Sequence, residues 1–177
     1  PARTSPDPAE LFNPEGFQVY AGGRGGRYTY HGPGQGVVYV MLDLNRRGRD
    51  LRRYVHALEG WAIATLAELG IVARRVPGRI GIWVEHLGGE AKIGAIGVRV
   101  RRWVTMHGMA INLAPKLSHF SGIVPCGIAD ASVTSLDEMG VRDVQTRFDL
   151  ALRSGLERFL ASIGERSGRV ESHSLSV

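Results

Sequence analysis

The residue best suited to chemistry in this sequence is its single cysteine, Cys126, in the run Pro125-Cys126-Gly127. A lone cysteine among apolar residues is most often a buried structural thiol. Pro125, however, fixes its own φ angle and lacks an N–H group, and Gly127 permits a sharp turn. The thiol can therefore be presented at the end of a turn, a position that suits a nucleophile. The residues alone leave both interpretations open.

A thiolate nucleophile needs a nearby cation or base, and the candidates are Lys92, His31, His107 and the arginines. Lys92 lies in an apolar, glycine-containing segment. Its side chain is either exposed at the edge of a strand or a partly buried amine. If it lies beside Cys126, the two groups form a coupled acid–base pair. His31 and His107 are each followed by glycine, so they either line one cleft or occupy ordinary turn and core positions.

The sequence also argues against several classes of site. No Asp or Glu accompanies the histidines at the spacing of metal ligands, so we expect no metal. One cysteine cannot form an internal disulfide, which favours a reducing, cytoplasmic compartment. The glycine-dense stretch 22–36 precedes the strand-like segment 37–44, whereas Rossmann and P-loop motifs need the strand before the glycines. Nucleotide binding of those two kinds is not predicted.

Composition indicates one globular domain. The chain has 177 residues, of which 44% are hydrophobic and 22% are charged, as in ordinary folded domains. No apolar run approaches the roughly 18 residues of a membrane span, and the first residues lack the apolar core of a signal peptide. We therefore expect neither export nor a membrane partner. The net charge of +5 indicates an acidic partner.

Apolar periodicity predicts the elements that position these residues. Residues 1–16 form an arm, and a short strand at 17–20 follows. The clearest helix covers 50–69, with Asp50 as N-cap and Gly70 just beyond its end. A second helix covers 144–163 and ends at Gly164, before a flexible tail at 165–177. Further strands are expected at 37–44, 71–76, 79–85, 91–100 and 103–113. This order predicts an α+β fold, an antiparallel meander with two helices packed on one face.

Four sequence blocks carry a resemblance to a known family. They are Arg24-Gly25-Gly26 with Thr29-Tyr30-His31-Gly32-Pro33-Gly34-Gln35, Lys92-Ile93 with Gly97-Val98-Arg99-Val100, His107-Gly108 with Asn112, and Pro125-Cys126-Gly127. In this order and spacing, over about two thirds of the chain, they resemble the lipoyl(octanoyl) transferases of lipoate biosynthesis, the LipB family. Each block alone is a weak signal, whereas the four together are highly specific.

The resemblance implies the α+β fold of the biotin and lipoate protein ligases, with a larger mixed sheet and a smaller one. It implies transfer of an octanoyl group from acyl carrier protein to a lysine of lipoyl domains. The acceptors are those of 2-oxoacid dehydrogenase complexes and the glycine cleavage H protein. No cofactor is implied, because a thioester is already activated. In the family the matching cysteine, here Cys126, carries the acyl thioester, and the matching lysine, here Lys92, lowers its pKa. The same matching gives these substrate-binding residues: Arg24, Gly25, Gly26, Arg27, Tyr28, Thr29, Tyr30, His31, Ala95, Ile96, Gly97, His107, Gly108, Met109 and Ala110.

Two departures from the family pattern are visible. Family members carry more strand and helix before the first block, so residues 1–177 are expected to be a single catalytic domain that lacks part of that region. Met106 precedes His107 at a position where the family pattern has an aromatic residue. This difference changes the size of the side chain and not the chemistry of the site.

Two other functions stay open on the sequence. An ATP-dependent lipoate or biotin protein ligase of the same fold would need no nucleophilic cysteine. A basic RNA-binding module would use Arg24, Arg27, Tyr28 and Tyr30 as a loop with stacking aromatics. Dispersed arginines and an aromatic content of 7% argue against it, so no nucleic-acid partner is predicted.

Overall fold

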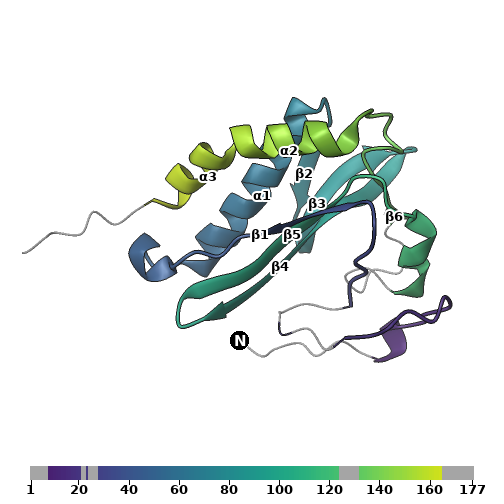
Figure 1. Cartoon of the computed structure of the whole chain (residues 1–177), viewed down its shortest axis with the longest axis horizontal. Helices are drawn as coiled ribbons and strands as arrows, with labels where there is room; N and C mark the ends of the chain where they lie inside the picture. The colour runs from purple at the N-terminus through teal and green to yellow at the C-terminus, as the bar shows by residue number, and fades with distance from the viewer. Residues whose placement is uncertain (1–7, 21–22, 24–27, 124–131, 165–177) are drawn as a thin grey trace, which may run out of the picture.

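Six strands form one sheet, which a layer of helices covers on one face (Figure 1). The computed structural model describes residues 8–20, 23, 28–123 and 132–164, and the structural statements below refer to these residues. The strands are β1 (Gln35–Tyr39), β2 (Ala73–Val76), β3 (Arg79–His86), β4 (Gly89–Arg101), β5 (Val104–Asn112) and β6 (Ser132–Val133). Their order is β1-β5-β4-β3-β2, all antiparallel, and β6 pairs in parallel with β4. The predicted meander is confirmed, and the described residues contribute to one sheet rather than to two.

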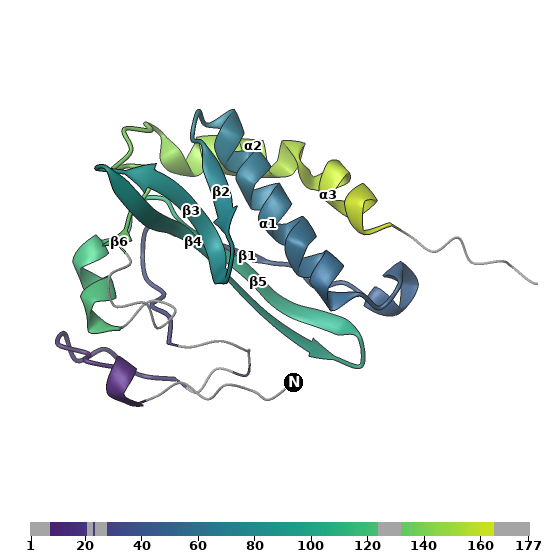
Figure 2. The ribbon, with the colours of Figure 1, turned by 180° about the vertical axis from the view of Figure 1, so that it is seen from behind.

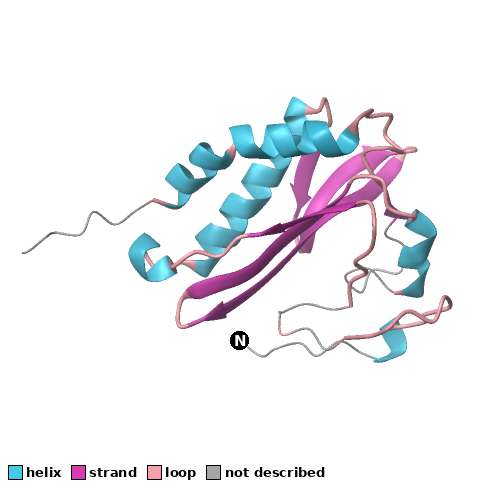
Figure 3. Cartoon of the chain, in the orientation of Figure 1, coloured by secondary structure: helices cyan, strands magenta, loops and turns pink. Residues whose placement is uncertain are grey.

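Three helices lie together on one side of this sheet (Figures 1 and 3). They are α1 (Leu51–Glu68), α2 (Val144–Ser154) and α3 (Leu156–Ile163). The ends of α1 are those predicted: the Asp50 carboxylate accepts a hydrogen bond from the Arg53 backbone N–H at 2.9 Å, and Gly70 has a φ of +85°. A side-chain cap and a left-handed glycine satisfy the free backbone groups of helix ends.

The helix predicted over 144–163 is interrupted at Gly155 because Trp61 of α1 packs there. A Cβ atom on Gly155 would lie 2.9 Å from the Trp61 ring, so only glycine leaves room for the indole. The indole N–H donates to the Leu152 carbonyl at 2.9 Å. In a continuous helix, that carbonyl would accept a hydrogen bond from the backbone N–H of residue 156. A side chain that inserts between the two groups is a known cause of helix kinks.

Two further predictions are corrected near the amino-terminal end. Residues 17–20 form no strand, and the arm instead contains a short 3₁₀ turn, η1 (Pro8–Glu10), and a bridge between Leu11 and Ile123. The strand predicted over 37–44 is shorter, because a second turn, η2 (Leu44–Arg47), begins where the Asp43 carboxylate accepts a hydrogen bond from the Asn45 backbone. The tail predicted at 165–177 lies outside the described residues.

The hydrophobic core lies between the sheet and the helices. It combines Tyr54, Leu58 and Leu66 of α1 with Phe148 of α2, Phe159 of α3 and the inward residues of β3, β4 and β5. The arm and a third 3₁₀ turn, η3 (Leu117–Gly122), lie on the other side of the sheet in both views (Figures 1 and 2). The sheet therefore has one face committed to the core and one face turned toward the arm.

Candidate active site

Lys92 lies on the sheet face turned away from the helices. Its neighbours Ala91 and Ile93 both belong to the core under the helices, whereas Lys92 and its cross-strand partner Trp83 do not. Residues paired across neighbouring strands share a face of the sheet. Lys92 and Trp83 therefore stand together on the face that the arm approaches.

The Lys92 side chain is buried and closely packed. The residue is 8% exposed, and its Nζ lies 5.7 Å from the centroid of the Trp83 ring, within the range of a cation–π contact. A Cβ atom on Gly81 would lie 2.6 Å from the Lys92 Cε and 3.2 Å from its Nζ. Because β4 is a central strand, the structure supports the partly buried amine and not an exposed side chain at a strand edge.

A lane of small residues runs from Lys92 along the same face. The lane consists of Ala95 paired with Ala110, and Gly97 paired with Gly108. Lys92 and Ala95 are three residues apart, so regular alternation would place them on opposite faces. The β3–β4 register is irregular at this point, and Gly94 pairs with the core residue Ile111. Ala95, the next residue, therefore lies on the same face as Lys92. The glycine and alanine residues of the predicted segments 95–97 and 108–110 therefore lie together.

Two other predicted substrate-binding residues point the opposite way. Met109 belongs to the core, and its partner Ile96 packs against that core beneath the helices. The physical reason is the two-residue period of a strand, which sends successive side chains to opposite faces. The structure thus divides the predicted segments 95–97 and 108–110 between the two faces of the sheet.

A chain of polar contacts joins the glycine-dense block to the strand of Lys92. The His31 Nδ1 lies 3.2 Å from the Gln35 Oε1, and the Gln35 Nε2 donates to the Asn112 Oδ1 at 3.0 Å. The buried Asn112 amide donates to the Thr134 carbonyl at 3.0 Å. The Thr134 backbone N–H in turn donates to the Lys92 carbonyl at 3.0 Å. One continuous network therefore connects β1, β5, the residue that follows β6, and β4.

Tyr30 anchors the same block to the arm and to η3. Its hydroxyl lies 2.7 Å from the His119 Nδ1. The Tyr30 ring centroid is 5.2 Å from those of His119 and Phe120 and 5.7 Å from that of Phe17. Tyr28 and Thr29, also predicted to bind substrate, are half-buried just before it. His119, to which the sequence assigns no role, thus fixes a predicted site residue.

His31 and His107, for which the sequence leaves open either one shared cleft or ordinary turn and core positions, stand at opposite ends of β1. His31 contacts Gln35 at the start of this strand. The His107 ring lies 6.4 Å from that of Tyr39 at its end. Four residues of extended strand separate these ends by about 13 Å. The described contacts therefore place His31, but not His107, in the polar network.

Cys126 lies outside the described residues, as do Arg24, Gly25, Gly26 and Arg27. The described chain that follows Cys126 begins at β6, six residues later, where Ser132 pairs with Ala91 and Val133 pairs with Lys92. Six residues after Cys126, the chain is therefore in contact with the strand that carries Lys92.

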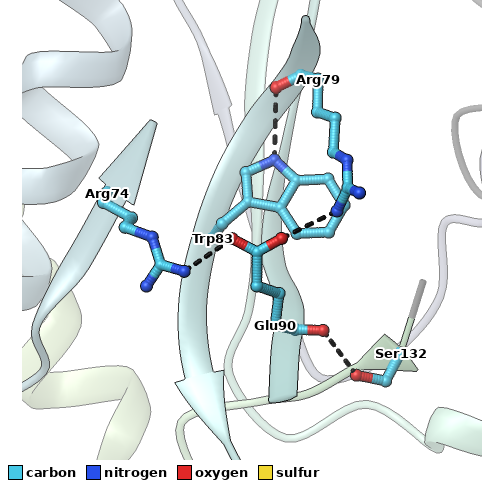
Figure 4. A network of polar contacts seen from close by, with 5 residues as sticks. All are labelled: Arg74, Arg79, Trp83, Glu90 and Ser132. Atoms are coloured by element: carbon cyan, nitrogen blue, oxygen red, sulfur yellow. Dashed lines mark hydrogen bonds and ion pairs between the residues drawn. The ribbon is translucent and has the colours of Figure 1, made fainter. Parts of the chain in front are cut away.

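A charged cluster also contacts Trp83 (Figure 4). The Glu90 carboxylate lies 2.6 Å from the Arg74 guanidinium and 2.8 Å from that of Arg79. The Arg79 Cζ lies 5.6 Å from the Trp83 ring centroid, and its carbonyl accepts the indole N–H at 3.3 Å. Ser132 of β6 donates to the Glu90 carbonyl at 2.9 Å. The cluster thus ties Trp83 to the strand that follows the cysteine segment.

Sequence reasoning did not select Gly81 or Trp83 as site residues. Trp83 could have been found, because a tight turn at Leu87-Gly88 pairs His86 with Gly89 and, counting outward, Trp83 with Lys92. Gly81 carries no comparable signal, since its role depends on a φ of +130° and on the path of the Lys92 side chain.

The described residues contain no group of three or more His, Cys, Asp or Glu side chains that could hold a metal ion. Among the same residues, no helix has the length and apolar character needed to cross a membrane.

Comparisons with known proteins show the family to which the chain belongs. The model of the lipoyl protein ligase A/B catalytic domain matches residues 7–149. An octanoyltransferase of Sphingopyxis alaskensis is 64% identical over 160 residues, which cover 90% of this chain and 73% of the relative. One of Rhodospirillum rubrum is 61% identical over 152 residues, covering 85% and 70%.

Solved structures share the fold at low identity. A lipoate-protein ligase A bound with ATP is 18% identical, with a TM-score of 0.60 over 82% of this chain and 60% of that one. A bipartite lipoate protein ligase from Thermoplasma acidophilum is 19% identical, with a TM-score of 0.55 over 77% and 55%. The chain thus spans little more than half of these ligases and about three quarters of the curated relatives. It belongs to the lipoyl protein ligase A/B catalytic family and, within that family, to the octanoyltransferases.

Proposed function

We propose that this chain moves an octanoyl group from acyl carrier protein to a lysine of a lipoyl domain, in the cytoplasm, through a thioester on Cys126. The observation that carries the proposal is the buried Lys92 amine at the end of the small-residue lane, on the strand that pairs with β6. The identity to octanoyltransferases supports the same reaction.

In the first half-reaction, the Cys126 thiolate attacks the thioester carbonyl of the donor. A carbon–sulfur bond forms to Cys126, and the bond to the phosphopantetheine sulfur breaks. The Lys92 ammonium gives its proton to that departing sulfur. The products are an octanoyl-cysteine, a free phosphopantetheine thiol and a neutral Lys92 amine.

In the second half-reaction, the amine of the acceptor lysine attacks the octanoyl-cysteine. An amide bond forms, the bond to Cys126 breaks, and the neutral Lys92 accepts the proton that the acceptor amine loses. This proton returns Lys92 to its starting charge, and Cys126 leaves as a thiolate. The cycle therefore balances without ATP or a metal ion.

The lane of Ala95, Gly97, Gly108 and Ala110 fits an acyl chain, because small side chains let an apolar substrate lie close to the backbone. The net charge of +5 fits an acidic acyl carrier protein, since opposite charge raises the rate of encounter. Lipoyl domains of 2-oxoacid dehydrogenases and of the H protein are the proposed acceptors.

Intact mass spectrometry after incubation with octanoyl acyl carrier protein tests the proposal. We expect one added octanoyl group, located on Cys126 by peptide mapping, and its loss when an apo lipoyl domain is added. The Cys126→Ala protein should accept no acyl group. Normal transfer by that variant, or transfer only with ATP and free octanoate, contradicts the proposal and favours a ligase.

The two lysines of the chain provide a matched test of the acid–base role. Lys92→Ala should lower transfer strongly and move the alkylation of Cys126 to higher pH, because a nearby ammonium favours the thiolate. Lys116→Ala, a change at an exposed residue before η3, is the control and should alter neither property. Equal effects of the two substitutions would remove Lys92 from the mechanism.

A further inference from the structure

Two residues of β3 that have no part in the chemistry lie against the Lys92 side chain. Trp83 presents its ring at 5.7 Å from the Nζ, and Gly81 presents bare backbone beneath the Cε and Nζ. Trp83 is itself completely buried. A lysine side chain has four rotatable bonds, so an amine that must transfer protons in both half-reactions needs such restraints.

Gly81 meets two requirements that no other residue satisfies. Its φ of +130° lies in the region that side chains rarely adopt. A Cβ atom there would also lie 2.8 Å from the Gly94 carbonyl oxygen and 2.6 Å from the Lys92 Cε. The carbonyl belongs to a central strand and cannot move aside easily. Even alanine at position 81 would therefore displace the lysine side chain.

Trp83 is held in turn by the charged cluster of Arg74, Arg79 and Glu90 (Figure 4). The Arg79 carbonyl fixes the indole N–H, and its guanidinium lies 5.6 Å from the ring centroid. The ring thus has cations of two different residues, Arg79 and Lys92, within cation–π distance. One of them is anchored by Glu90, and the other is the proposed acid–base group.

We propose that Trp83 and Gly81 are positioning residues that hold the Lys92 amine in reach of the acyl-transfer centre. This inference rests on the proposed function, in which Lys92 exchanges protons with the donor sulfur and the acceptor amine. The ring acts through Lys92 and touches no reacting atom. Its contribution therefore depends entirely on the presence of Lys92.

Three tryptophan substitutions test the inference in the full chain. Trp83→Leu removes the ring, Trp83→Phe keeps an aromatic face, and Trp61→Phe is the matched control. Trp61 is also a buried tryptophan whose indole N–H donates to a backbone carbonyl, but it packs between the helices. A general loss of packing would affect the control as well.

We expect Trp83→Leu to lower kcat about 10-fold, as a cation–π contact of about 1.4 kcal/mol implies, with KM for octanoyl acyl carrier protein unchanged. Trp83→Phe should lose less, and Trp61→Phe should keep the kcat of the unsubstituted protein. The pH profile of Cys126 alkylation should shift upward with Trp83→Leu and stay unchanged with Trp61→Phe. Gly81→Ala should reproduce the loss of kcat.

The same substitutions in the Lys92→Ala protein decide between positioning and general packing. Trp83→Leu should have no further effect on rate or on the alkylation profile there. An equal loss with and without Lys92, or an unchanged kcat in Trp83→Leu, overturns the inference while transfer through Cys126 stands. If Trp83→Leu does not fold, the comparison of Trp83→Phe in the two backgrounds decides. Full activity of Lys92→Ala overturns the proposed function and this inference together.

Discussion

Asn112 provides a test of how strongly the polar network binds β6 to the sheet. Its side chain is 4% exposed, accepts a hydrogen bond from Gln35 and donates one to the Thr134 carbonyl, each at 3.0 Å. Asn112→Ala removes both bonds. Each is worth about 1 kcal/mol net, and leaving a buried partner unsatisfied adds about 1 kcal/mol. We therefore expect the free energy of unfolding to fall by about 2–3 kcal/mol.

For a chain of this size, that loss corresponds to about 4–12 °C in Tm. Urea unfolding measures it as a lower midpoint with an unchanged m-value. Gln35→Ala removes one of the two Asn112 bonds, together with the contacts of the Gln35 Oε1 to His31 and to the Gly32 backbone N–H, and should cost about 1–2 kcal/mol. In the Gln35→Ala protein, Asn112→Ala should cost about 1 kcal/mol less than in the unsubstituted protein, because the shared bond is already absent. A loss below about 0.5 kcal/mol, or strictly additive losses, would refute the network as a stabilising unit.

Three further predictions concern the packing at Gly155, the small-residue lane and the titration of Tyr54. Gly155→Ala places a Cβ atom 2.9 Å from the Trp61 ring and should lower the unfolding free energy by about 1–3 kcal/mol, measured in urea. Ala110→Val narrows the small-residue lane and should shift the preferred donor toward acyl chains shorter than octanoyl, measured as relative kcat/KM; an unchanged preference removes the lane from the acyl site. Burial raises the pKa of Tyr54 above its ordinary 10.0, against a smaller lowering by the Thr105 hydroxyl. The folded state thus holds the Tyr54 proton more tightly than the unfolded state. Stability is therefore fully present below pH 10 and falls as pH rises beyond it, and Tyr54→Phe should remove that part of the slope in alkaline urea titrations.

Much of the fold follows from local pattern. The helix 51–68 has both its cap and its terminal glycine in the sequence, and the meander has tight turns that fix pairing partners. The break at Gly155 could not be predicted, because the carbonyl it frees is used by Trp61, which lies more than 90 residues away in sequence. Long-range partners of this kind leave no periodic signal.

The candidate site was predicted unevenly for the same reason. Sequence blocks select Lys92 and the lane residues, but they cannot say which side of a strand a residue faces. Strand alternation sends Ile96 and Met109 into the core, and the irregular register near Ile82 lets Lys92 and Ala95 share the other face. Gly81 is recognised only once the path of the Lys92 side chain is known.

The bridge between Leu11 and Ile123 has a consequence for the order in which the molecule assembles. The β2–β5 meander and α1 join residues close in sequence, whereas this bridge closes a loop of more than 100 residues. Because loop closure must precede any gain from such a contact, we expect the bridge to form after the meander. The backbone N–H groups of Phe12 and Asn13, which both donate to the Gly122 carbonyl, depend on that later step. We therefore expect the strands around Lys92 to pair before the arm joins η3.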